Sequence, residues 1–183
     1  MINDLLAEAE SKMQAAVEYV ASEFGTVRTG RANPQLLHRV NVEYYGTATP
    51  LQQLASISVP EPRLLVISPF DKSTVNDIEK AIQQADLGLN PTNDGQVIRI
   101  AFPPLTEERR EELIKVVRHM AEEGKVSVRN VRRASKSDME ELHGDISDDD
   151  IRRGEDELQE LTDKYTEKID QLLDRKEDEL LEV

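Results

Sequence analysis

The chain has 183 residues, of which 33% are charged and 38% are hydrophobic, a composition that excludes a disordered chain. With three Phe, four Tyr and no Trp, its cores must consist mainly of aliphatic residues, which favours packed helices. Its formal net charge of −14 argues against a nucleic-acid partner unless the basic residues are gathered apart from the acidic ones. Cysteine is absent, which excludes disulfides, thiolate metal sites and cysteine nucleophiles.

The first segment has a helical pattern. Hydrophobic residues recur every three or four positions from Leu6 to Val27, which predicts one amphipathic helix that ends before Gly30. The start of the chain lacks the basic residues and the unbroken apolar run of a signal peptide, and no stretch approaches the roughly 20 apolar residues of a membrane span. We therefore expect a soluble, cytoplasmic protein with no membrane partner.

The middle of the chain is rich in β-forming residues. The predicted elements are strands near residues 40–44, 54–59, 64–68 and 97–102, and a short helix at 75–85. We interpret residues 31–104 as a small α/β domain inserted into a helical bundle of residues 1–30 and 105–183. At the two boundaries, Gly permits backbone rotation and Pro stiffens the backbone, which predicts a two-stranded hinge. The hinge residues are Thr29, Gly30, Arg31, Pro103, Pro104 and Leu105.

Two more long helices are predicted in the last part of the chain. The second helix begins with Thr106 as its N-cap and runs to Gly144. The third begins at Ser147, where Ser-Asp-Asp-Asp resembles a capping box. Three helices that each carry one apolar stripe bury those stripes against one another. The sequence therefore predicts an α+β fold, with a long three-helix bundle and an inserted small β/α/β domain.

Acidic and basic residues occupy different segments of these helices. Residues 138–183 contain 19 acidic and 6 basic residues, whereas residues 105–137 contain 9 basic and 6 acidic residues. The acidic excess of the whole chain thus comes almost entirely from its C-terminal segment. The second helix is locally positive, which keeps a nucleic-acid partner possible.

The basic residues of the second helix form a stripe. Successive spacings of seven, four, three and four place five of them on one face, with Arg133 beside it: Arg118, Lys125, Arg129, Arg132 and Lys136. Planar guanidinium groups in a row can track a phosphate backbone without reading its bases. The alternative is a solvated helix face with local pairs such as Glu122 with Lys125, and helix geometry alone favours that alternative.

Six segments carry a resemblance to a known family. They are residues 28–32 (Arg-Thr-Gly-Arg-Ala), 42–46 (Val-Glu-Tyr-Tyr-Gly), 54–56 (Leu-Ala-Ser), 86–91 (Asp-Leu-Gly-Leu-Asn-Pro), 103–110 (Pro-Pro-Leu-Thr-Glu-Glu-Arg-Arg) and 128–133 (Val-Arg-Asn-Val-Arg-Arg). In this order, and across the whole chain, they resemble the signature segments of bacterial-type ribosome recycling factors. A single one of these segments would be weak, but six in order are specific.

The resemblance implies an L-shaped molecule and a non-enzymatic role without a cofactor. It implies that the bundle binds the large ribosomal subunit, against ribosomal RNA at the intersubunit face, after termination. Elongation factor G and its GTP hydrolysis then split the ribosome and release it from mRNA. The same resemblance implies a monomer with no DNA partner. The residues expected to contact ribosomal RNA are Arg132, Arg129, Arg133 and Lys136, with Arg28, Arg31, Arg109 and Arg110 as candidates near the hinge.

Other functional readings are weaker. No phosphate-binding loop is present, and the histidines at 38, 119 and 143 are too scattered for a metal or catalytic set. Asp148, Asp149 and Asp150 suit a helix start better than a cation site, and residues 88, 91 and 95 are interpreted as turn residues. Two rival classes are a helical scaffold or chaperone adaptor, and an enzyme with an unrecognised carboxylate pair in the inserted domain.

Overall fold

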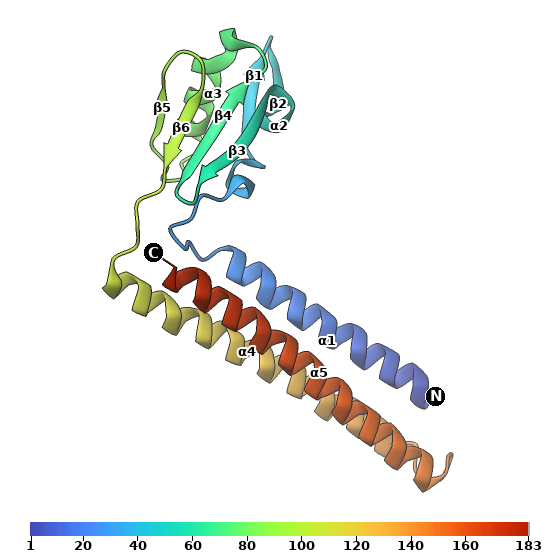
Figure 1. Ribbon diagram of the computed structural model, residues 1–183. Helices are drawn as coiled ribbons and strands as arrows, with labels where there is room; N and C mark the ends of the chain where they lie inside the picture. The colour runs from blue at the N-terminus through green and yellow to red at the C-terminus, as the bar shows by residue number, and fades with distance from the viewer. Residues whose placement is uncertain (183) are drawn as a thin grey trace. The chain divides into compact units, whose positions relative to one another are not determined.

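The structure is a computed structural model that describes residues 1–182, so residue 183, the last of the predicted bundle, lies outside the described residues. The chain divides into two compact units. One unit contains Met1–Arg28 together with the chain from Thr106 onward, and the other contains Thr29–Leu105. The first unit holds the long helices and the second holds the β-strands (Figure 1), which confirms the predicted α+β class.

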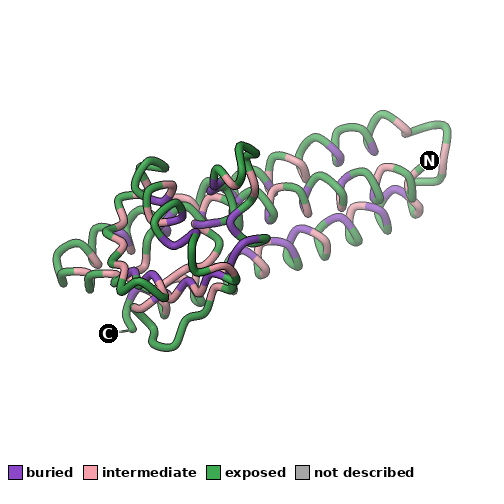
Figure 2. Tube along the Cα trace, turned by 90° about the horizontal axis from the view of Figure 1, so that it is seen from above, coloured by how far each residue is buried: buried purple, intermediate pink, exposed green. Residues whose placement is uncertain are grey.

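Three long helices form the first unit. They are α1 (Ile2–Gly25), α4 (Glu107–Glu140) and α5 (Asp148–Leu181). Each helix buries one stripe of small and aliphatic residues toward the other two, and Figure 2 shows this stripe as buried positions that recur along each helix. The most buried members include Met13, Val20, Val117, Val128, Met139, Leu158 and Ile169. The three-helix bundle predicted from periodicity is confirmed.

Both predicted N-caps are present. The side chain of Thr106 accepts a hydrogen bond from the backbone N–H of Arg109 at 3.1 Å. Ser147 accepts from the N–H of Asp150 at 3.2 Å, and its hydroxyl donates to the carboxylate of Asp150 at 2.7 Å. Each cap satisfies backbone donors that the first turn of a helix leaves open, and three aspartates suit the positive end of α5.

The predicted end of the first helix is confirmed, and that of the second is wrong. Helix α1 ends at Gly25, before Gly30, because Thr26 turns the chain and bonds back to Glu23. Helix α4 ends at Glu140 rather than at Gly144, which adopts a left-handed φ of +96° in the following turn. In both places the apolar pattern continues beyond the helix, since a turn can also bury hydrophobic side chains.

Gly124 lies inside α4 because the neighbouring helices leave no room for a side chain. A Cβ at this position would lie 2.3 Å from Cγ2 of Val20 in α1 and 3.3 Å from Cδ1 of Ile169 in α5. Gly154 in α5 is similar, since a Cβ there would lie 2.8 Å from Cγ2 of Ile2. Glycine lowers the intrinsic stability of a helix, but at these two positions it allows the helices to pack closely.

A four-stranded antiparallel sheet forms the second unit, in the order β3-β4-β6-β5. Its strands are β3 (Ala55–Glu61), β4 (Leu64–Pro69), β5 (Pro91–Asn93) and β6 (Ile98–Ala101). Helix α3 (Val75–Gln84) covers one face. Leu65 pairs with Ile100 and Ile67 with Ile98, so their side chains share the buried face. The predicted strands and short helix are confirmed, with shifted ends.

A β-hairpin precedes this sheet. Its strands are β1 (Asn41–Tyr44) and β2 (Thr47–Pro50), and a four-residue helix, α2 (Leu51–Leu54), follows. Tyr45 and Gly46 both have positive φ, at 49° and 78°, which is the backbone that a two-residue hairpin turn requires. The sequence prediction missed β2 and β5 because they are short and contain Pro, and Pro91 lies in β5 rather than in a turn.

The two segments at the boundary of this unit lie against each other. Gly30 has a φ of +76°, which favours glycine. A Cβ on Gly30 would lie 3.4 Å from Cγ of Leu105 and 3.6 Å from the carbonyl oxygen of Pro103. Glycine therefore fits both the backbone conformation and the limited space at this crossing.

Candidate nucleic-acid interface

The predicted basic stripe lies along the side of α4 that meets α5. Helices α4 and α5 run antiparallel, so a residue further along α4 faces a residue earlier in α5. The contacts follow this register, from Arg118 opposite Glu177 to Lys136 opposite Glu155. The stripe is therefore the edge of a helix–helix seam, and the partner helix is the most acidic part of the chain.

Near one end of the seam the basic groups are paired with carboxylates. Arg118 forms a two-pronged contact with Glu177, with Nε 2.5 Å from Oε1 and Nη2 3.3 Å from Oε2. Lys125 lies 2.9 Å from the carboxylate of Asp170 and 3.5 Å from that of Glu122. These positive charges are largely compensated before any partner arrives.

Two other members of the stripe also face carboxylates. Arg129 contacts Glu122 at 3.1 Å within α4. Lys136 lies between Glu140 at 3.8 Å and Glu155 of α5 at 3.7 Å, which are loose contacts. Local pairing along α4 thus exists, as the alternative reading expected, but contacts across the seam accompany it.

Arg132 and the neighbouring Arg133 differ from the other members of the stripe because their partners are neutral amides. Nη1 of Arg132 donates to Oε1 of Gln159 in α5 at 2.6 Å. Nη1 of Arg133 donates to Oδ1 of Asn130 at 3.5 Å. Neither guanidinium forms an ion pair with a carboxylate in residues 1–182. Their charges are therefore the least compensated of the stripe.

The pairing shifts the protonation equilibria of the seam in the expected directions. The hydrogen bond with Asp170 raises the pKa of Lys125, and the hydrogen bond with Glu177 raises the pKa of Arg118. The hydrogen bond from Arg129, helped by the charge of Lys125, lowers the pKa of Glu122. All of these groups stay charged near neutral pH, so the pattern of paired and uncompensated cations persists there.

The other predicted arginines lie close in sequence to the points where the chain passes from one unit to the other. Arg109 and Arg110 lie in the first turn of α4, roughly 30 Å along the helix from Arg132. Arg109 pairs with Glu112 at 2.8 Å. Arg110 is half-buried, and its Nε has no hydrogen-bond partner in the described part of the chain. Arg28 is the last residue of the first bundle segment, and Arg31 belongs to the second unit.

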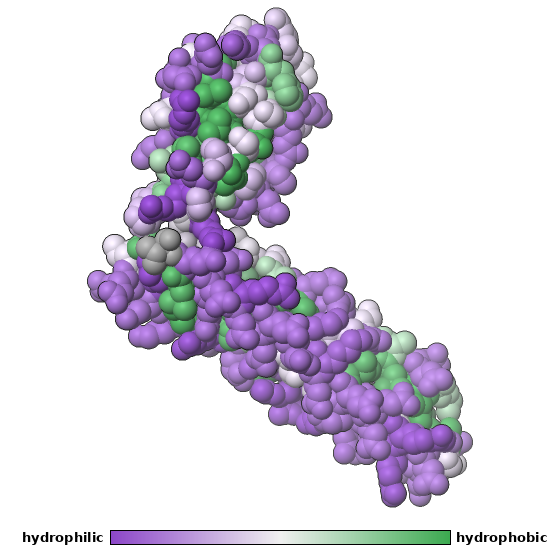
Figure 3. Space-filling view, viewed as in Figure 1, coloured by the Kyte–Doolittle hydropathy of each residue, from purple (hydrophilic) through white to green (hydrophobic). Residues whose placement is uncertain are grey.

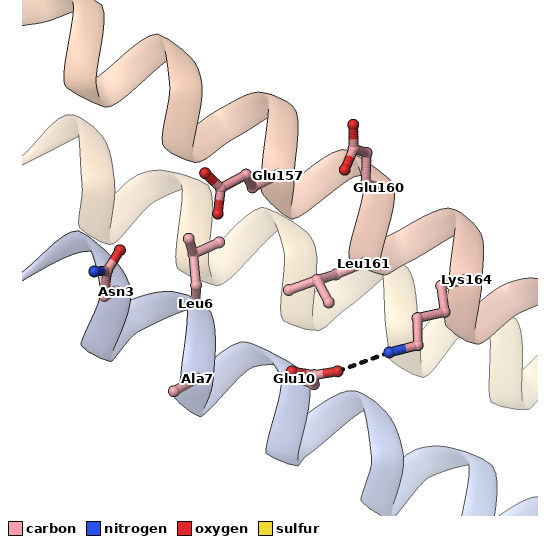
Figure 4. A pocket seen from close by; sticks show the side chains of 8 residues that line it. All are labelled: Asn3, Leu6, Ala7, Glu10, Glu157, Glu160, Leu161 and Lys164. Atoms are coloured by element: carbon pink, nitrogen blue, oxygen red, sulfur yellow. Dashed lines mark hydrogen bonds and ion pairs between the residues drawn. The ribbon is translucent and has the colours of Figure 1, made fainter.

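A groove between α1 and α5 has the opposite electrostatic character (Figure 4). It has a volume of about 440 Å³, and its lining residues are Asn3, Leu6, Ala7, Glu10, Glu157, Glu160, Leu161 and Lys164. Lys164 donates to Glu10 at 3.0 Å and Tyr165 donates to the same carboxylate at 2.8 Å. The hydrogen bond from Lys164 lowers the pKa of Glu10. Three carboxylates make this groove unsuited to phosphate, in contrast to the basic side of α4.

The sequence analysis did not find the α5 residues of the seam. Those residues are Glu155, Gln159, Asp170 and Glu177. The sequence did predict two helices of opposite charge. The α5 residues that face the basic stripe could be identified only from the register between the two helices. The space-filling view shows how hydrophilic the visible side of the bundle is (Figure 3), so exposure alone does not single them out.

The histidines lie apart from one another on the surface. His38, His119 and His143 are exposed, and the last two lie 3.2 Å from Glu123 and Asp148 respectively. Within residues 1–182, no group of three His, Asp or Glu side chains could hold a metal ion. In the same range, no helix is long and apolar enough to cross a membrane.

The sequence profile of the family described as "Ribosome recycling factor" matches residues 20–181. The chain belongs to this family. It is 56% identical over 185 aligned residues to the "Ribosome-recycling factor" of Carboxydothermus hydrogenoformans, and 55% identical to that of Bacillus subtilis. In both comparisons all of this chain and all of the relative are covered. The predicted family membership is confirmed.

Solved structures agree with this membership of the ribosome recycling factor family. One is described as the solution structure of the ribosome recycling factor, with a TM-score of 0.80, 48% identity, and coverage of 100% of this chain and 98% of that one. Another describes the Thermus thermophilus factor and Escherichia coli elongation factor G bound to the E. coli post-termination complex, with a TM-score of 0.65 and 44% identity. It covers all of both chains.

Proposed function

We propose that this chain binds the large ribosomal subunit after termination and, together with elongation factor G and its GTP hydrolysis, splits the ribosome and releases it from mRNA. Membership of the family over the full chain supports the role. The structural relative whose description names elongation factor G and a post-termination complex supports the two partners. GTP chemistry then belongs to elongation factor G, so this chain acts as a non-enzymatic, cofactor-free monomer in the cytoplasm.

The bundle is the proposed ribosome-binding part, through the C-terminal third of α4. Arg132 is the central contact to ribosomal RNA, with Arg129, Arg133 and Lys136 around it. The observation that carries this choice is the neutral partner of Arg132, since a guanidinium without a carboxylate can give its full charge to phosphate. Because such contacts release counterions, binding falls steeply with salt.

The second part of the proposal concerns the boundary between the bundle and the inserted domain. Arg28, Arg31, Arg109 and Arg110 would add contacts to RNA there. The inserted domain, residues 31–104, would change its orientation during splitting by rotation at Thr29, Gly30, Arg31, Pro103, Pro104 and Leu105. The positive φ of Gly30 supports this hinge, because glycine can change φ at little cost.

Light scattering of post-termination ribosomes tests the proposal directly. Wild-type protein, elongation factor G and GTP should together lower the scattering, and neither factor alone should do so. Arg132→Ala should abolish most of the effect. Arg118→Ala is the matched control, since it removes the same side chain from the same stripe but from a position already paired with Glu177.

The outcomes separate the parts of the proposal. Splitting by Arg132→Ala at the wild-type rate would remove Arg132 from the interface but keep the function. No splitting by the wild-type protein, with ribosomes that another recycling factor does split, would reject the function and return the scaffold interpretation to first place.

A further inference from the structure

Gln159 occupies an exceptional position in the α4–α5 seam. The stripe residues that reach across to α5 are Arg118, Lys125, Arg132 and Lys136, and their α5 partners are Glu177, Asp170, Gln159 and Glu155. Three of these four partners are carboxylates, and only Gln159 is neutral. Residues 138–183 contain 19 acidic residues but only two glutamines, Gln159 and Gln171. The neutral side chain at position 159 is therefore an exception among the α5 residues that face the stripe.

The two neighbours of Gln159 fix the orientation of its amide. A guanidinium has only donors, so Arg132 requires the carbonyl oxygen, which lies 2.6 Å from its Nη1. A carboxylate has only acceptors, so Asp163 requires the amide nitrogen, and Nε2 donates to its Oδ1 at 2.8 Å. The amide cannot flip without breaking both bonds. Gln159 thereby links Arg132 to the carboxylate of Asp163 in one orientation.

A neutral hydrogen bond has a different effect on Arg132 from an ion pair. It holds a long side chain, which otherwise loses rotamer freedom when it binds a ligand. It also leaves the positive charge uncompensated, whereas a carboxylate at the same distance would form an ion pair that a phosphate would have to displace. Glutamine is the side chain of this length and shape that orients a guanidinium without neutralising it.

We propose that Gln159 is a positioning residue for ribosomal RNA binding: it holds the guanidinium of Arg132 in place while keeping its charge available to phosphate. This inference rests on the proposed function, because it takes Arg132 as an RNA contact. The acidic helix α5 thus contributes to RNA binding indirectly. Gln159 carries no charge and acts through Arg132, without a contact of its own to RNA.

The decisive substitution is Gln159→Glu, which preserves size and adds one negative charge next to Arg132. The probe is the purified large ribosomal subunit, with binding measured over a series of KCl concentrations. We expect about tenfold weaker binding. The slope of log affinity against log salt should become less steep by about 0.7–0.9, as for the loss of one phosphate contact. Thermal stability should change little, since the new ion pair with Arg132 is offset by the lost hydrogen bond to Asp163 and by repulsion between the two carboxylates.

Two further variants separate positioning from simpler effects. Gln171→Glu adds the same charge to the same helix, at an exposed site three turns along, and should bind within about twofold of wild type. Gln159→Met removes the hydrogen bond but adds no charge. It should weaken binding about threefold and leave the salt slope unchanged, because Arg132 is less ordered but still uncompensated.

Each outcome decides something definite. Wild-type affinity and slope in Gln159→Glu would overturn the inference, and so would equal weakening by Gln159→Glu and Gln171→Glu, which would reveal a simple effect of net charge. Arg132→Ala in the same assay tests the proposed function separately. If that variant binds as tightly as wild type, the RNA contact itself is wrong; if it binds weakly while Gln159→Glu does not, only the role of Gln159 fails.

Discussion

The basic stripe on α4 has a first end, Arg118 and Lys125, and a second end, Arg132 with Arg133 beside it and Lys136 beyond it in only loose contact with carboxylates at 3.7 and 3.8 Å. The two ends have the same kind of residue and different electrostatic surroundings. At Arg118 and Lys125 the neighbouring helix supplies carboxylates at 2.5 and 2.9 Å. At Arg132 it supplies the oxygen of an amide. The difference teaches that a stripe of cations on one helix has two uses: some members hold two helices together, and others remain available to a ligand. Spacing along α4 does not distinguish them, whereas the partner does.

The strongest test compares double substitutions at the two ends. Arg132→Ala with Arg133→Ala should weaken binding to large ribosomal subunits about 10- to 100-fold, because both remove uncompensated charges. Arg118→Ala with Lys125→Ala removes the same formal charge and should weaken binding no more than about threefold, since those cations are already paired. Filter binding at fixed salt measures both. Equal losses would mean that net charge, rather than pairing, governs the interaction.

Gly124 lies at the first end of the stripe, next to Lys125, and its substitution should have the next largest effect. Gly124→Ala gains helix propensity of about 1 kcal/mol, but the new Cβ would lie 2.3 Å from Val20 and the overlap costs about 1–3 kcal/mol. We expect a net loss of about 1 kcal/mol in bundle stability, measured by urea unfolding followed by circular dichroism. Both ends of the seam should weaken together if Gly124 sets the spacing of the helices.

A matched pair of variants checks the cause of that loss. Gly25→Ala, at a helix end where a Cβ would meet nothing within 4 Å, should be neutral or stabilising. Val20→Ala combined with Gly124→Ala should recover part of the loss of Gly124→Ala, since it removes the methyl group that clashes. A double variant less stable than the sum of the two single variants would rule out steric overlap as the cause.

The ion pair at the first end should contribute only modestly to stability. A double-mutant cycle with Arg118→Ala and Glu177→Ala should give a coupling energy of about 0.5 kcal/mol, because Arg118 is exposed. The coupling should shrink as salt rises. The corresponding cycle with Arg132→Ala and Gln159→Ala should change little with salt, because one partner is neutral. A coupling of Arg132 with Gln159 that is as salt-sensitive as the first would contradict the distinction between the two ends.

Acid should affect the carboxylate-paired part of the stripe alone, and this is the smallest expected effect. The hydrogen bond from Arg129 lowers the pKa of Glu122 in the folded protein, so its contribution to stability is present above the ordinary glutamate pKa and is lost as pH falls below it. Glu122→Gln should therefore show a shallower decline of the thermal midpoint between about pH 6 and about pH 3 than wild type. An unchanged decline would mean that Glu122 is no better paired in the folded chain than in the unfolded one.

Some of the fold and site could be predicted because the signals are local. Apolar residues at helical spacing indicated the three long helices, and Thr106 and Ser147 marked two starts correctly. Short elements were harder, since a three-residue strand such as β5 has no period to detect and depends on its pairing with β6. Gly124 carried no local explanation either, because the residues that exclude a side chain there belong to other helices.

The sequence by itself determined the class of fold, the family and the face of α4 on which the basic residues lie. Periodicity and motif order can be recognised from the order of residues along the chain alone. Only the tertiary structure decided which of those residues keep an available charge. That choice depends on the register of α5 against α4, which places a carboxylate beside Arg118 and an amide beside Arg132. Register follows from the packing of whole helices, including the close approach at Gly124, and not from any short segment.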